Sequence, residues 1–389
     1  MLMRVIKICF ILSFVSGLAQ GQTKQDSLAI FVKKLTQNLI SEKQATGISI
    51  GIYHDGKSYF YNDGNIKKGK NSIPDQNTVY EIGSITKTFV SLVLANAVIE
   101  GKVKLEDDIR KYLKGDYPNL QYKGHPIKIV HLANTTSLLP DWLPALPEEM
   151  KKMEADAALQ FKMKYYKALT KKDFLKELHR VVLDTVPGTK REHSNAGAQL
   201  LAYILEDVYH TSIDKLTEKY VTKPLGMNHT GFPAVKEKLA TGYTSDGKEA
   251  TYEFEIPYFK TAGGMGSSAS DLVKYLKLYL DNQNTAAMLS LKKTVDINAS
   301  TGEITSPGPE GIANPNVYSA CLNWFKYQPE PTASQIWADG GTNGFNSYIV
   351  MYPYSKMGIV LLCNTSSEKI FRALPNMASE ISNFMDKHP

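Results

Sequence analysis

Ser84 and Lys87 are the residue pair in this sequence whose types and spacing could create a nucleophile. They lie in the segment Ser84-Ile85-Thr86-Lys87, just before a long apolar stretch. Residues three apart share one face of a helix, so we expect the Ser84 hydroxyl and the Lys87 amine to meet within one turn. A free serine is a poor nucleophile and needs an adjacent base. The pair predicts an activated serine; two ordinary solvated helix positions are the alternative.

The residues after this pair favour the activated serine. The stretch from Phe89 to Ile99 is apolar on nearly every face, which is typical of a helix buried on all sides. Glu100-Gly101 then predicts its end, because glycine commonly follows the last helical turn. Burial lowers the pKa of a lysine toward the neutral form that can accept a proton. We therefore expect Lys87 to act as a base.

Two later segments hold further candidate residues. Pro187-Gly188 predicts a turn that leads through His193, Ser194 and Asn195 into a helix over 196–209, which Ser194 or Asn195 can cap. The segment 337–345 carries three glycines near a strand end, where a backbone could approach a ligand and an N–H could polarise a carbonyl. A simple helix cap and an ordinary glycine-rich turn are the alternatives.

The first residues have the pattern of a secretory signal peptide. Arg4 and Lys7 are followed by an apolar core from Ile8 to Ala19, and small residues suitable for cleavage come next. We expect residues 1–21 to be removed and the protein to be exported to the periplasm or the extracellular space. No later apolar run approaches the ~18 residues that a membrane span needs, so we expect no stable membrane insertion.

Composition excludes several other classes. Removing Arg4 and Lys7 takes the net charge from +6 to +4 (6 − 2), which is too mild to indicate nucleic acid as a partner. The eight histidines show no paired metal-ligand spacing, so we expect no metal and no cofactor. Cys321 and Cys363 lie in apolar segments and are expected to be buried free thiols, with a disulfide as the alternative. The expected partner is a small-molecule or peptide substrate, and the oligomeric state is open.

The periodicity predicts an α/β (α+β) fold whose antiparallel sheet is built from both chain ends. A helix is expected from Asp26 to Leu39, and a hairpin from Gly47 to Asn62 around an Asp-Gly turn. Later strands are predicted over 318–327, 335–338, 346–351 and 357–363, before a final helix over 369–385. Residues 22–389 then form one domain, with an α/β part of roughly 22–105 and 251–389. An inserted helical lobe of roughly 106–250 contains six lysines between Lys162 and Lys176 that are expected to be solvated.

Eight segments, in order along the mature chain, resemble the penicillin-recognising serine hydrolases. The segments around Ser84, around Asn195 and over 337–345 correspond to the three motifs of that group. These motifs are Ser-x-x-Lys, Ser-Asp-Asn (or Tyr-x-Asn) and Lys-Thr-Gly. The closer similarity is to the branch of class C β-lactamases, D-alanyl-D-alanine carboxypeptidases and related esterases. The segments are GISIGIYHDGK, residues 77–89, IKIVHLANTTSLLPDW, PGTKREHSNAGAQLLAYILE, KPLGM, AGGMGSSASDL, GGTNGF and GIVLLCNTS.

The resemblance implies a β-lactamase/transpeptidase-like fold and assigns roles to single residues. Ser84 resembles the acylated nucleophile, Lys87 its neighbouring base, and His193 stands where the family has a tyrosine. Asn195 resembles the asparagine that contacts the substrate and the lysine. In the third motif Ala338, Asp339 and Gly340 stand where Lys or His, Thr or Ser, and Gly are usual. Asp339, Gly340, Gly341 and Thr342 are thereby predicted to contact substrate, with Gly341 supplying a second oxyanion N–H beside that of Ser84.

Two departures from the family pattern affect the expected activity. His193 can accept and return a proton near neutral pH, so it is a plausible substitute for tyrosine, although it is shorter. Ala338 removes the cation that would bind a substrate carboxylate, and an anionic Asp339 in the cleft would repel one. We therefore expect a serine hydrolase acting on an ester, an amide or a D-amino-acid peptide rather than an efficient β-lactamase. The alternative is a binding or sensing protein that has lost turnover on the same fold.

Overall fold

The computed structural model describes residues 26–42, 45–232, 238–307, 317–330 and 333–387. Within these residues nine strands form one antiparallel sheet in the order β2-β1-β13-β12-β11-β10-β9-β7-β8. The strands are β1 (Gly47–His54), β2 (Lys57–Gly64), β7 (Val295–Asn298), β8 (Ile304–Thr305), β9 (Val317–Ala320), β10 (Phe325–Glu330), β11 (Ala333–Gly341), β12 (Asn346–Tyr352) and β13 (Met357–Cys363). The predicted pairing of the two chain ends is confirmed, because β1 lies beside β13. The predicted signal peptide lies outside the described residues.

Two small sheets and a set of helices complete the described architecture. The small sheets pair β3 (Val79–Glu81) with β6 (Gly266–Ser268), and β4 (Gln121–Tyr122) with β5 (His125–Pro126). The α-helices are residues 26–41, α2 (Thr86–Ile99), α3 (Ile129–Ala133), α4 (Ala155–Lys167), α5 (Lys171–Leu178), α6 (Asn195–Tyr209), α7 (Ile213–Thr217), α8 (Lys260–Gly263), α9 (Ala269–Leu280), α10 (Thr285–Ser290) and α11 (Glu368–Lys387). Short helical turns are η1 (Gly83–Ile85), η2 (Ile109–Tyr112), η3 (Glu148–Lys152), η4 (Glu218–Thr222), η6 (Glu253–Glu255) and η7 (Pro257–Phe259).

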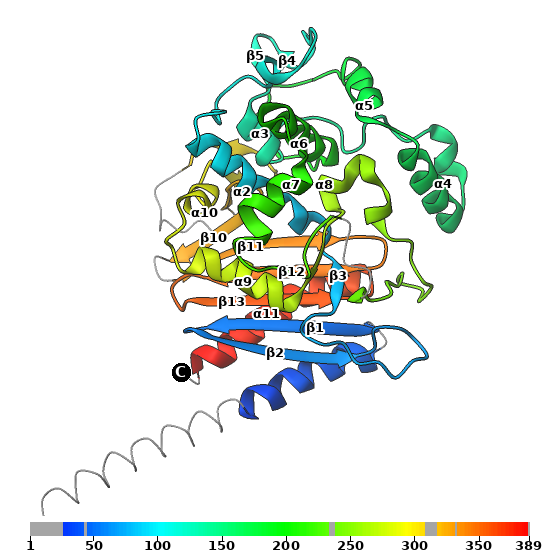
Figure 1. The fold of residues 1–389 in the computed structure, drawn as a ribbon, viewed down its shortest axis with the longest axis vertical. Coiled ribbons are helices and arrows are strands. Elements are labelled where there is room, and N and C mark those ends of the chain that lie inside the picture. Colours follow the sequence, from blue (N-terminus) through cyan, green and yellow to red (C-terminus); the bar gives the residue numbers. More distant parts are fainter. Residues whose placement is uncertain (1–25, 43–44, 233–237, 308–316, 331–332, 388–389) are drawn as a thin grey trace, which may run out of the picture.

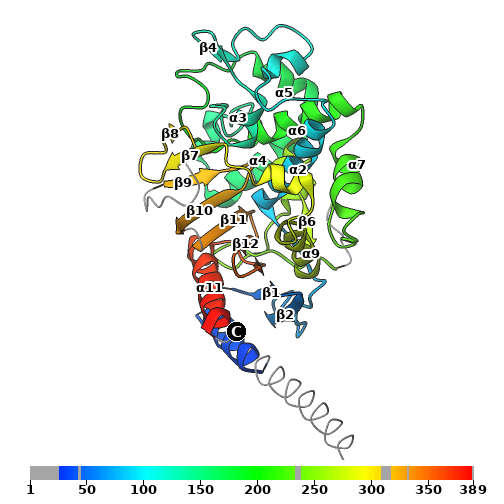
Figure 2. The ribbon, with the colours of Figure 1, turned by 90° about the vertical axis from the view of Figure 1, so that its left-hand side faces the viewer.

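The sheet separates two apolar cores. On one face, Ile48, Ile50 and Ile52 of β1 pack with the helix of residues 26–41 and with α11. On the other face, Gly51 lies against Val273 of α9, where a Cβ would come within 2.6 Å of Val273 Cγ2. Figure 2 shows α11 on one side of the sheet and α9 on the other. β1 is therefore buried on both faces, with its isoleucines on one face and Gly51 on the other.

The predicted hairpin and the predicted last strand are confirmed. The chain reverses at Asp55 and Gly56, whose φ angles of +47° and +83° fit the two-residue turn that an Asp-Gly step favours. His54 pairs with Lys57 directly across that turn. The strand predicted over 357–363 is β13. Cys321 and Cys363 are buried and are not joined in a disulfide, as expected.

The single strand predicted over 318–327 is wrong, because the chain turns between β9 and β10. At the turn, Cys321 N–H donates to the carbonyl of Trp324 (2.8 Å), and Asn323 has a φ of +57°. Trp324 is fully buried, with its ring 5.1 Å from that of Tyr279. Burying this side chain against α9 therefore interrupts the strand.

The helices of the middle of the chain lie over one end of the sheet. In Figure 1, α3, α5 and α6 stand above the strands and α2 lies between them and the sheet. The predicted division at residues 105 and 250 remains a prediction. None of the helices within the described ranges is both long and apolar enough to span a bilayer.

Candidate active site

The first site segment is held by a sharp turn between a strand and a buried helix. β3 leads through Gly83, which has a φ of +50°, into η1 and then into α2. Lys87 lies one turn after Ser84, and its Nζ is 2.8 Å from Ser84 Oγ. Gly101, with a φ of +69°, follows the end of α2 as predicted. The structure thus brings the predicted hydroxyl and amine into direct contact.

The amine of Lys87 is enclosed by three polar partners. Besides Ser84, it donates to Asn195 Oδ1 (3.1 Å) and to the carbonyl of Ala262 (2.6 Å). The side chain is almost fully buried, and burial lowers its pKa to about 8, against the opposing charges of Asp141, Glu253 and Asp339. A neutral amine has two hydrogens and one lone pair, which suits two donations, to Asn195 and Ala262, and acceptance of the Ser84 proton.

The second segment supplies a helix cap as well as polar groups. Ser194 is the residue before α6, and its Oγ accepts from Gly197 N–H (2.8 Å), so Ser194 rather than Asn195 is the cap. Asn195 is the first residue of α6, which orients its side chain to Lys87. The half-exposed ring of His193 lies with its Nδ1 2.8 Å from Asp141 Oδ1.

The third segment brings backbone atoms of β11 against the turn of Ser84. A Cβ on Gly340 would lie 2.0 Å from the Ile82 carbonyl oxygen and 2.9 Å from Ser84 N. A Cβ on Gly83 would lie 2.6 Å from Gly341 N. Ser347 Oγ donates to the Ile82 carbonyl (2.8 Å) and so connects β12 to the same turn. This close packing explains Gly83 and Gly340 and brings the turn of Ser84 against the backbone of Gly341.

The remaining residues of the third motif differ in their surroundings. Ala338 is buried in the core, with no cation at its position. Burial raises the pKa of Asp339, and the charges of Arg191, Lys87 and His193 oppose this shift, so these three cations act on its carboxyl. Thr342 is buried and its hydroxyl lies beside the carboxyl of Glu81.

Comparison with known proteins gives the family. The family model described as Beta-lactamase matches residues 32–379. The chain belongs to the β-lactamase family. It is 25% identical to a β-lactamase of Yersinia enterocolitica, over 89% of each chain. It is 24% identical to the D-alanyl-D-alanine-carboxypeptidase/endopeptidase AmpH of Escherichia coli K12, over 94% of this chain and 91% of that one.

The fold agrees with solved members of the β-lactamase family. A class C β-lactamase structure superimposes with a TM-score of 0.74 at 22% identity, covering 92% of this chain and 96% of that one. The antiparallel sheet and its flanking helices are therefore those of the β-lactamase fold. This confirms the resemblance to the penicillin-recognising serine hydrolases and the predicted fold class.

Two charged residues of the candidate active site, Asp141 and Glu253, were not predicted from the sequence. Asp141 contacts His193, and Glu253 lies beside Gly263, with its Oε2 3.7 Å from where a Cβ of Gly263 would be. Burial raises the pKa of Glu253 against the charges of Lys162 and Lys87. Asp141 and Glu253 come from segments that are far apart in the chain. Asp141, in Leu-Pro-Asp-Trp, carried a local signal as an acid beside a proline and a tryptophan.

Four of the six lysines from Lys162 to Lys176 are exposed, as expected, whereas Lys162 and Lys171 are partly exposed and also contact aromatic rings. The Nζ of Lys162 lies 3.9 Å from the centre of the Trp142 ring, and its charge acts on Glu253. A cation over an aromatic face is stabilised by the ring quadrupole, so the contact with Trp142 favours this position of the Lys162 amine. The helical periodicity of the lysines gave no sign of that contact.

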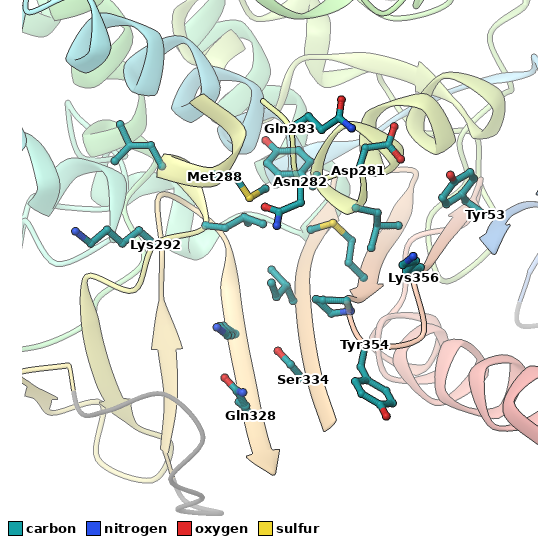
Figure 3. A pocket seen from close by; sticks show the side chains of 18 of the residues that line it. Tyr53, Asp281, Asn282, Gln283, Met288, Lys292, Gln328, Ser334, Tyr354 and Lys356 are labelled. Atoms are coloured by element: carbon teal, nitrogen blue, oxygen red, sulfur yellow. The ribbon is translucent and has the colours of Figure 1, made fainter. Parts of the chain in front are cut away.

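A separate pocket of about 1260 Å³ lies elsewhere on the protein. Figure 3 shows it between the segment that joins α9 to α10 and the strands β10, β11 and β12, with Asn282, Met288 and Tyr354 among its labelled residues. Its lining contains neither Ser84 nor Lys87. The pocket is thus distinct from the candidate active site.

Proposed function

We propose that this chain is an exported serine hydrolase that cleaves an ester or amide bond through an acyl-enzyme on Ser84. The observation that carries the proposal is the 2.8 Å contact between Ser84 Oγ and a buried Lys87 whose pKa is lowered to about 8. A lysine with this pKa is partly neutral near physiological pH and can accept the serine proton.

The proposed reaction has two stages. Lys87 takes the Ser84 proton, the oxygen attacks the substrate carbonyl, and the leaving group departs with a proton. The N–H groups of Ser84 and Gly341 stabilise the oxyanion, in the manner of preorganised backbone donors. Water then attacks the acyl-enzyme, with His193 helping to accept its proton. Membership of the β-lactamase family supports this assignment of roles.

The charges around Lys87 support a neutral or amine-bearing substrate, including a D-amino-acid peptide. Asp141, Glu253 and Asp339 all act on Lys87, and Ala338 offers no cation at the third motif. A carboxylate group on the substrate would meet this negative charge. Activity on β-lactams or on the free carboxyl end of a peptide, as the names of two relatives describe for those proteins, is therefore proposed to be weak.

A binding or sensing protein without turnover is the second candidate. It is favoured by His193 and Ala338, which alter the second and third motifs. Hydrolysis of short-chain p-nitrophenyl esters, D-amino-acid amides and nitrocefin by wild type and by Lys87→Ala separates the two. We expect ester or amide turnover that falls at least 100-fold in the variant. Equal rates for the two proteins would favour the binding protein.

Export is part of the proposal and rests on the pattern of residues 1–21. We expect the mature protein, recovered outside the cytoplasm, to begin close to residue 22. An intact mass that includes the first 21 residues, found in the cytoplasm, would contradict export.

A further inference from the structure

The contact between Asp141 and His193 forms a carboxylate–imidazole dyad at the edge of the site. His193 Nδ1 lies 2.8 Å from Asp141 Oδ1, which also accepts from Asn195 N–H (3.0 Å). We propose that Asp141 is a positioning residue that fixes the tautomer of His193 and leaves its Nε2 as the proton acceptor for acyl transfer at Ser84. This inference rests on the proposed function and deepens it.

The donor and acceptor roles in the dyad follow from the charge of Asp141. Burial raises the pKa of Asp141. The hydrogen bond and charge of His193, the N–H of Asn195 and the charge of Lys87 lower it by more, so that the net pKa is below the usual value. Asp141 is therefore ionised at neutral pH and can only accept hydrogen bonds. Nδ1 of His193 must carry the hydrogen that it shares with Asp141. In a neutral imidazole this leaves the lone pair on Nε2.

The loop of Asp141 is joined to the loop of His193 by several hydrogen bonds. Backbone bonds join Gly188 N–H to the Thr136 carbonyl (2.8 Å) and Glu192 N–H to the Thr135 carbonyl (2.9 Å). Ser194 Oγ donates to the Pro140 carbonyl (3.0 Å). These bonds fix the spacing of the two loops independently of the Asp141 side chain.

The same loops show further constraint at Asp141 itself. Its backbone carbonyl accepts from Ala196 N–H (3.1 Å), at the start of α6. Thr135 and Leu138 have φ angles of +57° and +60°, which non-glycine residues rarely adopt. Such strained positions persist where the surrounding structure over-determines them, and they are common at functional sites. Asp141 is thus held on a rigid loop rather than by its carboxylate alone.

In the proposed deacylation step, His193 carries one proton from water to Ser84 Oγ. Water forms a bond from its oxygen to the acyl carbon and gives one proton to His193 Nε2. The bond between the acyl carbon and Ser84 Oγ then breaks, and the proton passes to that oxygen, which restores the serine. Asp141 keeps its charge throughout and stabilises the imidazolium. Lys87 and Asp339 are the other charged groups that act on this dyad.

Two variants of Asp141 separate positioning from simple structural support. Asp141→Ala removes the acceptor, whereas Asp141→Asn keeps an oxygen that can accept from Nδ1 at the same place. We expect kcat/KM on a p-nitrophenyl ester to fall about 100-fold in Asp141→Ala, mainly in kcat, and about tenfold in Asp141→Asn. In a His193→Ala background, Asp141→Ala should change the rate less than tenfold, because there is no ring left to position and only the charge that acts on Lys87 is lost. The exposed Asp55→Asn is the matched control.

A second measurement does not depend on activity. Nitrogen-15 shifts of the His193 ring, assigned by comparison with His193→Gln, should report a protonated Nδ1 and an unprotonated Nε2 in neutral wild type, and a mixture in Asp141→Ala. An Nε2–H tautomer in wild type, or an equal rate loss for Asp141→Ala with and without His193, would overturn the inference. Failure of wild type to form a Ser84 adduct with a fluorophosphonate would instead contradict the proposed function, and the ring shifts still decide the tautomer.

Discussion

The carboxyl of Glu81 accepts a hydrogen bond from the backbone N–H of Phe254 (2.9 Å). This bond joins the strand that leads to Ser84 with the segment that carries Glu253. The Glu81 side chain is almost fully buried. Burial, and secondarily the charge of Glu253, raises its pKa to about 8, although the N–H of Phe254 opposes the shift. A protonated glutamic acid therefore supports the nucleophile segment at neutral pH.

Glu81→Gln should make the stability less sensitive to pH. A raised pKa means that the folded state binds more protons than the unfolded state between the ordinary value of 4.5 and about 8. The contribution of Glu81 to stability is thus present at low pH and is lost as pH rises through that window, by roughly 4 kcal/mol from pH 5 to 8. Urea unfolding of both proteins at pH 5 and pH 8 should show this difference in slope. Parallel pH dependence in the two proteins would show that Glu81 is ionised when folded.

Lys87→Met should separate stability from activity. The pKa of Lys87 is lowered from 10.5 to about 8, so between these values the unfolded state binds more protons than the folded state. Wild-type stability should therefore gain about 3 kcal/mol, relative to Lys87→Met, as pH rises from 8 to 10.5. At pH 7 the variant should be at least as stable as wild type while losing ester turnover. A variant that is much less stable at pH 7 would mean that the hydrogen bonds of Lys87 outweigh its burial cost.

Gly340→Ala and Gly341→Ala form a matched pair of tests for the backbone contact at Ser84. A Cβ on Gly340 would lie 2.0 Å from the Ile82 carbonyl oxygen, so β11 must move away from the nucleophile turn. At Gly341 the nearest atom to a new Cβ is Asn346 Nδ2 at 3.4 Å, which leaves room. We expect fluorophosphonate labelling to slow at least 100-fold in Gly340→Ala and less than tenfold in Gly341→Ala. Equal effects of the two changes would argue against this contact.

Asp339→Asn should improve binding of anionic substrates. The Asp339 carboxyl lies near Lys87, His193 and Arg191, so neutralising it removes a repulsive charge and leaves the cations in place. We expect the KM for a carboxylate-bearing ester to fall about tenfold relative to its neutral analogue. Asp281→Asn, which makes the same charge change at the separate pocket, is the control. An unchanged KM ratio would place Asp339 outside the substrate path.

The sequence was sufficient for features that depend on neighbouring residues. The Asp-Gly turn fixed the first hairpin, and the spacing of Ser84 and Lys87 predicted their contact. The break at Trp324 was not predictable from strand propensity, because it depends on packing against α9. Tertiary contacts of this kind override local preference.

Most contacts of Lys87 could not be predicted from local sequence patterns, because they also depend on tertiary structure. Its partners Asn195 and Ala262 are 108 and 175 residues away. The family resemblance supplied Asn195, whereas the effect of Asp141 and Glu253 on the amine depends on how the fold places their loops. The contact of Lys162 with Trp142 likewise depends on the fold and could not be predicted from the helical spacing of the lysines.

The central claim is that Ser84 becomes covalently modified through the help of Lys87. Intact-protein mass spectrometry after treatment with a fluorophosphonate, followed by peptide mapping, tests it most directly. We predict one adduct per chain on Ser84, no adduct in Ser84→Ala, and labelling at least 100-fold slower in Lys87→Ala. An adduct that persists in Ser84→Ala, or a wild-type protein that stays unmodified, would contradict the account.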